Sequence, residues 1–155
     1  MRVAIEQLSD HAHVWIFGIS PALDAAKSDR VLEQVDGFLE SWHAHNVPIT
    51  GARDLVEGSF LVVAADEHRE KSGCSIDRMF GLLRSLEREL SVTILDSGRV
   101  FYRDADGVRA VPRGAFRSSA TAETAVFDTT AERLGELRSG QWERRAADSW
   151  HKQLL

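Results

Sequence analysis

The sequence predicts an α+β fold, an antiparallel sheet with two main helices on one face. Two long segments carry apolar residues three and four positions apart, which is typical of helices with one buried face. Short β-branched and aromatic runs, bounded by Gly, Pro and Asp, lie around them. The order β-α-β-β-α-β-β favours a ferredoxin-like βαββαβ core. We place this core at about residues 11–112 of a single domain spanning 1–155, followed by a C-terminal extension at about 113–155.

The first half of the chain predicts a strand, a helix and a strand pair. Residues 13–17 form an almost continuous apolar run, which indicates a central strand. A helix is expected from an N-cap at Ser28 to about His45, because apolar residues recur on one face. Residues 53–57 and 59–65 predict paired strands joined by a glycine turn.

The second half predicts one more long helix and a hairpin. An apolar stripe from Ile76 to Leu90 indicates the helix. Asp104-Ala105-Asp106-Gly107 predicts a tight turn between strands at 99–103 and 108–111. Past Pro112 we expect short helices at 113–120 and 131–138, a strand at 125–127, and a docked tail that carries Trp142 and Trp150.

Composition narrows the class of protein. The 155 residues are 43% hydrophobic and 28% charged, which is typical of a globular chain. The net charge of −5 argues against nucleic acid and anionic membranes as partners, since both favour basic surfaces. No run approaches the ~18 apolar residues of a membrane span, and a single cysteine fits a reducing compartment. We therefore expect a cytoplasmic protein.

The segment Ser72-Gly73-Cys74-Ser75-Ile76-Asp77 is the leading chemical feature. If Ser72 is the N-cap, Cys74 lies in the first turn, where the helix dipole favours a thiolate nucleophile. If Ser75 is the N-cap, Cys74 instead packs against Met79 as a hydrophobic staple. The sequence leaves both alternatives open.

A nucleophilic Cys74 needs a base and a group that orients it. His68 and His151 are the candidate bases, and Asp77 is a candidate orienting acid that would otherwise be an ordinary dipole partner. We predict no metal site, because the His and Cys residues lack the repeated spacing of metal ligands. No cofactor is expected.

An arginine-rich segment interrupts the acidic average of the chain. Residues 99–117 contain five arginines and only two acids, interleaved with aromatic residues; the arginines are Arg99, Arg103, Arg109, Arg113 and Arg117. Guanidinium groups suit phosphate or carboxylate ligands, although these side chains could equally pair with acids elsewhere. The candidate ligand-binding residues are Ser72, Gly73, Ser75, Arg103 and Arg109.

The cysteine segment resembles that of a family of small bacterial proteins of unestablished function, often labelled ABC transporter ATPase. The match also includes Val100-Phe101-Tyr102-Arg103-Asp104, Ala110-Val111-Pro112, Val126-Phe127-Asp128 and Ser149-Trp150-His151, and it spans most of the chain. The resemblance implies that the cysteine segment is a family hallmark, but it implies no activity. The ATPase label does not fit, because neither Lys-Ser pair follows the glycine that a phosphate-binding loop requires.

Two functions follow from these observations. We favour a non-catalytic binding or interaction domain that receives a small anionic ligand or a protein partner near the cysteine segment and the arginine hairpin. The alternative is a cysteine-dependent enzyme, for acyl transfer or thiol redox chemistry, with Cys74 as the nucleophile. A homodimer is compatible with either function.

Overall fold

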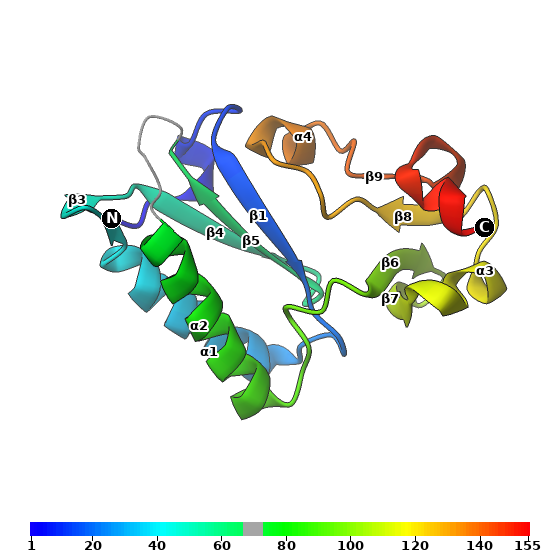
Figure 1. Cartoon of the computed structure of the whole chain (residues 1–155), viewed down its shortest axis with the longest axis horizontal. Helices are drawn as coiled ribbons and strands as arrows, with labels where there is room; N and C mark the ends of the chain where they lie inside the picture. Colours follow the sequence, from blue (N-terminus) through cyan, green and yellow to red (C-terminus); the bar gives the residue numbers. More distant parts are fainter. Residues whose placement is uncertain (67–72) are drawn as a thin grey trace.

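The computed structural model describes residues 1–66 and 73–155. The chain forms two main antiparallel sheets, with two long helices packed against the first sheet (Figure 1). The helices are α1 (Ala25–Glu40), α2 (Gly73–Leu90), α3 (Phe116–Ser119) and α4 (Leu134–Arg138). The strands are β1 (His13–Gly18), β2 (His43–Ala44), β3 (Val47–Pro48), β4 (Gly51–Val56), β5 (Phe60–Ala65), β6 (Arg99–Asp104), β7 (Gly107–Pro112), β8 (Ala125–Phe127) and β9 (Glu143–Arg145). The predicted α+β class is therefore confirmed.

The first sheet has the strand order β1-β5-β4. The predicted pair β4 and β5 is confirmed, and a turn at Glu57 and Gly58, both with positive φ, joins the two strands. The prediction that residues 13–17 form the central strand is wrong. All six residues of β5 are buried, so β5 takes the centre.

The outer edge of β1 is closed near both ends by other segments. The Val14 amide donates to the Glu132 carbonyl at 3.0 Å. At the other end, Ser20 and Thr93 exchange two backbone hydrogen bonds. These bonds satisfy part of an edge that would otherwise be exposed to pairing with another chain.

Helix α1 differs from the prediction at both ends. It begins after Asp24, whose side chain accepts from the Lys27 amide at 2.8 Å, so Asp24 and not Ser28 is the N-cap. It ends at Glu40, and the next residues form the β2–β3 hairpin, whose turn places His45 and Asn46 at positive φ. Trp42 fits the helical spacing but lies beyond the helix, where it is fully buried.

Helix α2 lies beside α1 on the same face of the first sheet, as predicted (Figure 1). Its buried residues Met79, Leu83 and Leu86 meet Val31, Val35 and other residues of α1 in the largest apolar cluster. The Trp42 indole N–H donates to the Ser75 carbonyl at 3.3 Å, which ties the hairpin region to the start of α2.

The ferredoxin-like arrangement is not confirmed. Strand β6, which that arrangement would add to the first sheet, belongs instead to a second sheet of order β7-β6-β8-β9. Both faces of β6 are occupied there, because Phe101 and Val100 enter two different apolar clusters. The predicted hairpin of β6 and β7 is confirmed, and strands β8 and β9, from residues beyond 112, complete the sheet.

An aromatic cluster joins the two sheets. Phe60 from β5 packs against Phe101 from β6, Phe127 from β8 and Trp142 from the tail, with ring centroids 4.7 to 5.1 Å from Phe60. The expected docking of the tail is confirmed here, since Trp142 is buried.

Gly18 brings the sheets together. A Cβ at this position would lie 2.2 Å from Cε2 of Phe101, so the missing side chain gives the Phe101 ring its place against β1.

No helix within the described ranges combines the length and apolar composition that crossing a membrane requires.

Candidate functional site

A cavity of about 310 Å³ opens where the two sheets meet, and we call it the inter-sheet cleft. Its size falls at the lower end of the range that small-molecule sites occupy. Segments from both halves of the chain line it: Ile16, Phe17, Gly18, Phe80, Ile94, Leu95, Asp96, Ser97, Arg99, Phe101, Arg113, Thr129, Thr130 and Trp150.

The cleft has an apolar body. Phe17 of β1 and Phe80 of α2 form an edge-to-face pair with ring centroids 5.7 Å apart, and Phe101 of β6 lies against Gly18. These aromatic walls suit the apolar part of a small ligand.

The polar groups of the cleft include one cation without an acidic partner. Asp96 accepts from Nε of Arg99 at 3.0 Å, so these two charges offset each other. Arg113 has no ion pair with any described carboxylate. Its guanidinium lies over the Trp150 ring, 5.1 Å from the centroid, and donates to the Ser97 carbonyl at 3.4 Å. Arg113 is exposed, so it remains accessible to an anion.

The half-buried Trp150 and the buried His151 lie behind Arg113. The two rings are stacked, with centroids 4.0 Å apart, and Oγ of Ser149 lies 2.7 Å from Nδ1 of His151. Burial lowers the pKa of His151 to about 4, against a partial opposing effect of Asp128, so the imidazole is neutral at pH 7. The Trp150 indole N–H is inaccessible to solvent and has no hydrogen-bond partner among the described residues.

Cys74 is the second residue of α2, and its side chain is exposed. The staple alternative is therefore wrong, because it needs Cys74 before the helix and packed against Met79. Met79 is buried in the core without it. Gly73 and Asp77 of the same segment are also exposed, whereas Ser75 is buried.

Among the described residues, no histidine side chain forms a hydrogen bond with Cys74. The segment Trp150–Leu154, which contains His151, lies beside the C-terminus, on the opposite side of the molecule from the start of α2 (Figure 1). His151 itself is almost fully buried. The structure therefore does not bring together Cys74 and the predicted base His151. The predicted residues His68 and Ser72 lie outside the described residues.

The predicted anion ligands Arg103 and Arg109 are engaged within the protein. Arg103 donates to both carboxylate oxygens of Glu57, at 3.0 and 2.7 Å, and to Glu143 at 2.7 Å. Hydrogen bonds to these two acids raise its pKa above the usual value. Arg109 pairs with Asp104 and Asp106 of its own hairpin, at 2.9 and 3.0 Å. The β6–β7 hairpin that contains both arginines lies away from the start of α2 (Figure 1).

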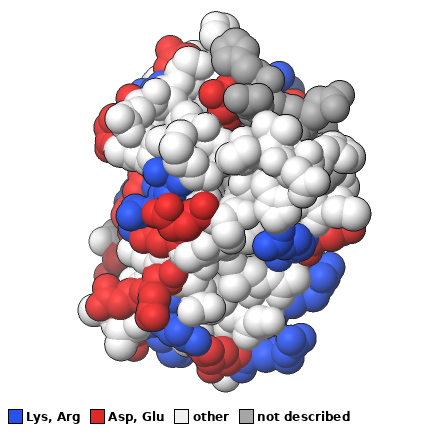
Figure 2. Space-filling model, turned by 90° about the vertical axis from the view of Figure 1, so that its left-hand side faces the viewer, with Lys and Arg blue, Asp and Glu red and all other residues white. Residues whose placement is uncertain are grey.

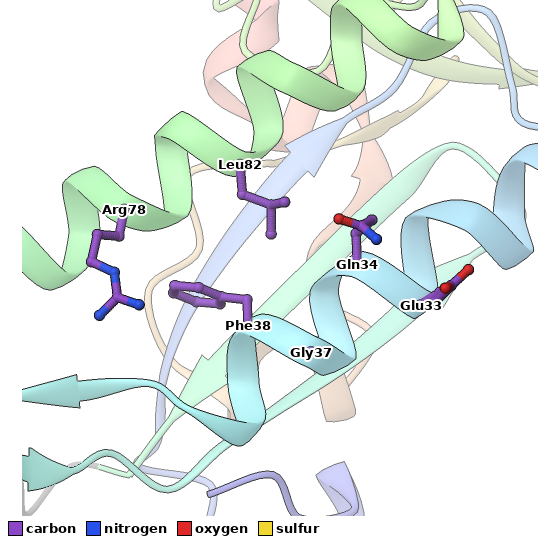
Figure 3. Close-up of a pocket in the computed structure, with 6 residues that line it drawn as sticks. All are labelled: Glu33, Gln34, Gly37, Phe38, Arg78 and Leu82. Atoms are coloured by element: carbon purple, nitrogen blue, oxygen red, sulfur yellow. The ribbon is translucent and has the colours of Figure 1, made fainter.

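A second concavity, of about 360 Å³, lies between α1 and α2 (Figure 3). Its lining is Glu33, Gln34, Gly37, Phe38, Arg78 and Leu82. It is a groove on the helical face and shares no residue with the inter-sheet cleft.

Within residues 1–66 and 73–155, no group of three or more His, Cys, Asp or Glu side chains is arranged to hold a metal ion.

Comparisons with protein-family models, with curated proteins and with solved structures found no match. The family resemblance of the cysteine segment stays a prediction.

The sequence placed Arg99 and Arg113 in one arginine-rich segment and Trp150 in the docked tail, but it did not bring the three residues together. The interleaving of arginines with aromatic residues was the available signal. Which arginine lacks an acid depends on the packing of β6, the tail and the loop after α2, which the order of residues does not reveal.

Proposed function

We propose that this chain is a non-catalytic ligand-binding domain whose inter-sheet cleft receives a small anionic molecule with an apolar body. The proposal rests on one observation, the lack of an ion pair at Arg113 among the described residues. Arg99, Arg103 and Arg109 are each paired with carboxylates, whereas Arg113 lies at the cleft and forms no ion pair with a described carboxylate.

The chemistry of recognition follows from the lining. The aromatic walls bury the apolar part of the ligand, and the guanidinium forms charge-assisted hydrogen bonds with a carboxylate or phosphate. Asp96 does not repel the ligand strongly, because Arg99 neutralises it. Thr129 and Thr130 also line the cleft, and the Thr130 hydroxyl donates to Asp128.

The test is a calorimetric titration with benzoate and phenyl phosphate, using benzamide as a neutral analogue of benzoate. The wild type should bind both anions more tightly than benzamide. Arg113→Gln should weaken anion binding by roughly tenfold or more, since a hydrogen bond to a charged group contributes about 1.5–3 kcal/mol. Arg117→Gln is the matched control, because Arg117 is exposed but does not line the cleft. Equal anion affinity in both variants would refute the proposed site.

A cysteine-dependent enzyme is the second candidate, favoured by the exposed thiol at the start of an 18-residue helix. On the preferred function, Cys74 is an ordinary exposed residue. Its thiol should then react slowly with an alkylating reagent at pH 6, and Cys74→Ser should change the free energy of unfolding by less than about 0.5 kcal/mol.

The enzyme function makes the opposite prediction for alkylation. A thiol activated as a nucleophile should react rapidly already at pH 6, well below the ~8.5 of a free cysteine. Rates measured with iodoacetamide from pH 5.5 to 9.5 decide between the two functions. A rapid plateau at low pH, with the fold of the serine variant intact, would replace the binding function by the enzymatic one.

A further inference from the structure

The groove between α1 and α2 has an apolar floor that the fold leaves partly open. Phe38 of α1 and Leu82 of α2 point toward one another across it, and Arg78 extends over the same space (Figure 3). Both apolar side chains are half-buried. On the side of the molecule where α1 and α2 lie, a broad uncharged area runs between clusters of both charge signs (Figure 2).

Gly37 makes the groove accessible to a second backbone. It is exposed in the last turn of α1, and a Cβ added there would meet nothing within 4 Å. A glycine inside a helix costs roughly 0.5–1 kcal/mol relative to alanine. No packing contact inside the chain requires this glycine, which is the pattern expected where another element approaches closely.

The charges at the groove are opposite and poorly satisfied within the chain. Arg78 has no ion pair with any described carboxylate. The Glu33 side chain is 72% exposed and lies 3.7 Å from Arg30. Arg30 itself directs two shorter hydrogen bonds, of 2.7 and 2.9 Å, to Glu89. Glu33 therefore remains available to a second cation.

We propose that this groove is the interface of a symmetric homodimer. In a two-fold interface, each contact between residue i and residue j occurs twice. Arg78 of one copy would meet Glu33 of the other, and the reverse pair would form across the axis, with Phe38 and Leu82 of both copies between them. An acidic peptide would satisfy Arg78 but would be repelled by Glu33, so a second copy fits the groove better.

Charge reversal tests the interface by sedimentation equilibrium in reducing buffer, from low micromolar to about millimolar chain. The wild type should associate into a dimer. Arg78→Glu and Glu33→Arg should each weaken self-association by roughly tenfold or more, because each creates two like-charged contacts. An equimolar mixture of the two variants should form a heterodimer, since both of its contacts are attractive again.

Two further variants keep the result interpretable. Arg117→Glu reverses an exposed arginine outside the groove and should associate like the wild type. Gly37→Leu should fold, because its side chain enters open space, but should block the approach of a second copy. A wild type that stays monomeric at all concentrations, or single variants that associate like the wild type, would overturn the proposal. So would a mixture that fails to associate.

Discussion

Arg113 differs from Arg99, Arg103 and Arg109 through its surroundings, not through its sequence neighbours. Arg103 and Arg109 belong to a hairpin that carries or faces acids, and their donors are used there. Arg113 follows the hairpin, and its guanidinium lies over the Trp150 ring at the inter-sheet cleft. A guanidinium stacked on an aromatic ring keeps N–H donors at its edge, where a ligand can accept them.

His151 yields a prediction about pH. Its pKa is lowered to about 4 in the folded state by burial, whereas an unfolded histidine titrates near 6.5. Between these values the unfolded chain binds the proton and the folded chain does not. The free energy of unfolding should therefore decrease as the pH falls from about 6.5 to 4, by an amount on the order of 2 kcal/mol.

Urea denaturation of the wild type and of His151→Gln at pH 7 and pH 4.5 measures this contribution. The loss of stability between the two pH values should be smaller in the variant, because glutamine does not titrate. His11→Gln is the control, since His11 is exposed. An identical pH dependence in the wild type and in His151→Gln would contradict the account of this buried imidazole.

The elements themselves were largely predictable, because their signals are local. The stripe of α2, the turn at Gly58 and the Asp-Gly hairpin each depend on neighbouring residues. The errors arose where tertiary contacts decide. Trp42 continues the helical spacing but lies beyond the end of α1, where its indole N–H donates to the Ser75 carbonyl. The central place of β5 depends on the burial of both its faces.

Packing between elements gives a prediction at Gly18. Gly18→Ala would place Cβ 2.2 Å from the Phe101 ring, so the ring and β6 must move away from β1. Overpacking of this kind costs about 1–3 kcal/mol, which should lower the melting temperature by several degrees. Gly114→Ala, where a Cβ meets nothing within 4 Å, is the matched control. A Gly18→Ala melt equal to that of the wild type would show that the two sheets do not depend on this contact.

At the scale of the whole molecule, the C-terminal residues are part of the sheet that forms the cleft. They supply β8, β9, Trp142 at the junction and Trp150 at the cleft. The sequence indicated a docked tail but not its destination, because pairing between β6 and β8 is a long-range contact. For the same reason the candidate site was expected beside Cys74, where the local helix signal is strong, and not at the meeting of the two sheets.

The most direct test of the proposed function is where a small anion binds. The chain has four tryptophans, and Trp150 is the one that lines the inter-sheet cleft. In nuclear magnetic resonance spectra of ¹⁵N-labelled protein, the indole signal that is missing from Trp150→Phe is assigned to Trp150. Benzoate should shift this signal in the wild type. It should leave those of Trp15, Trp42 and Trp142 largely unchanged. In Arg113→Gln the shift should require a much higher benzoate concentration. An unshifted Trp150 signal, or an equal titration in the two proteins, would contradict the account.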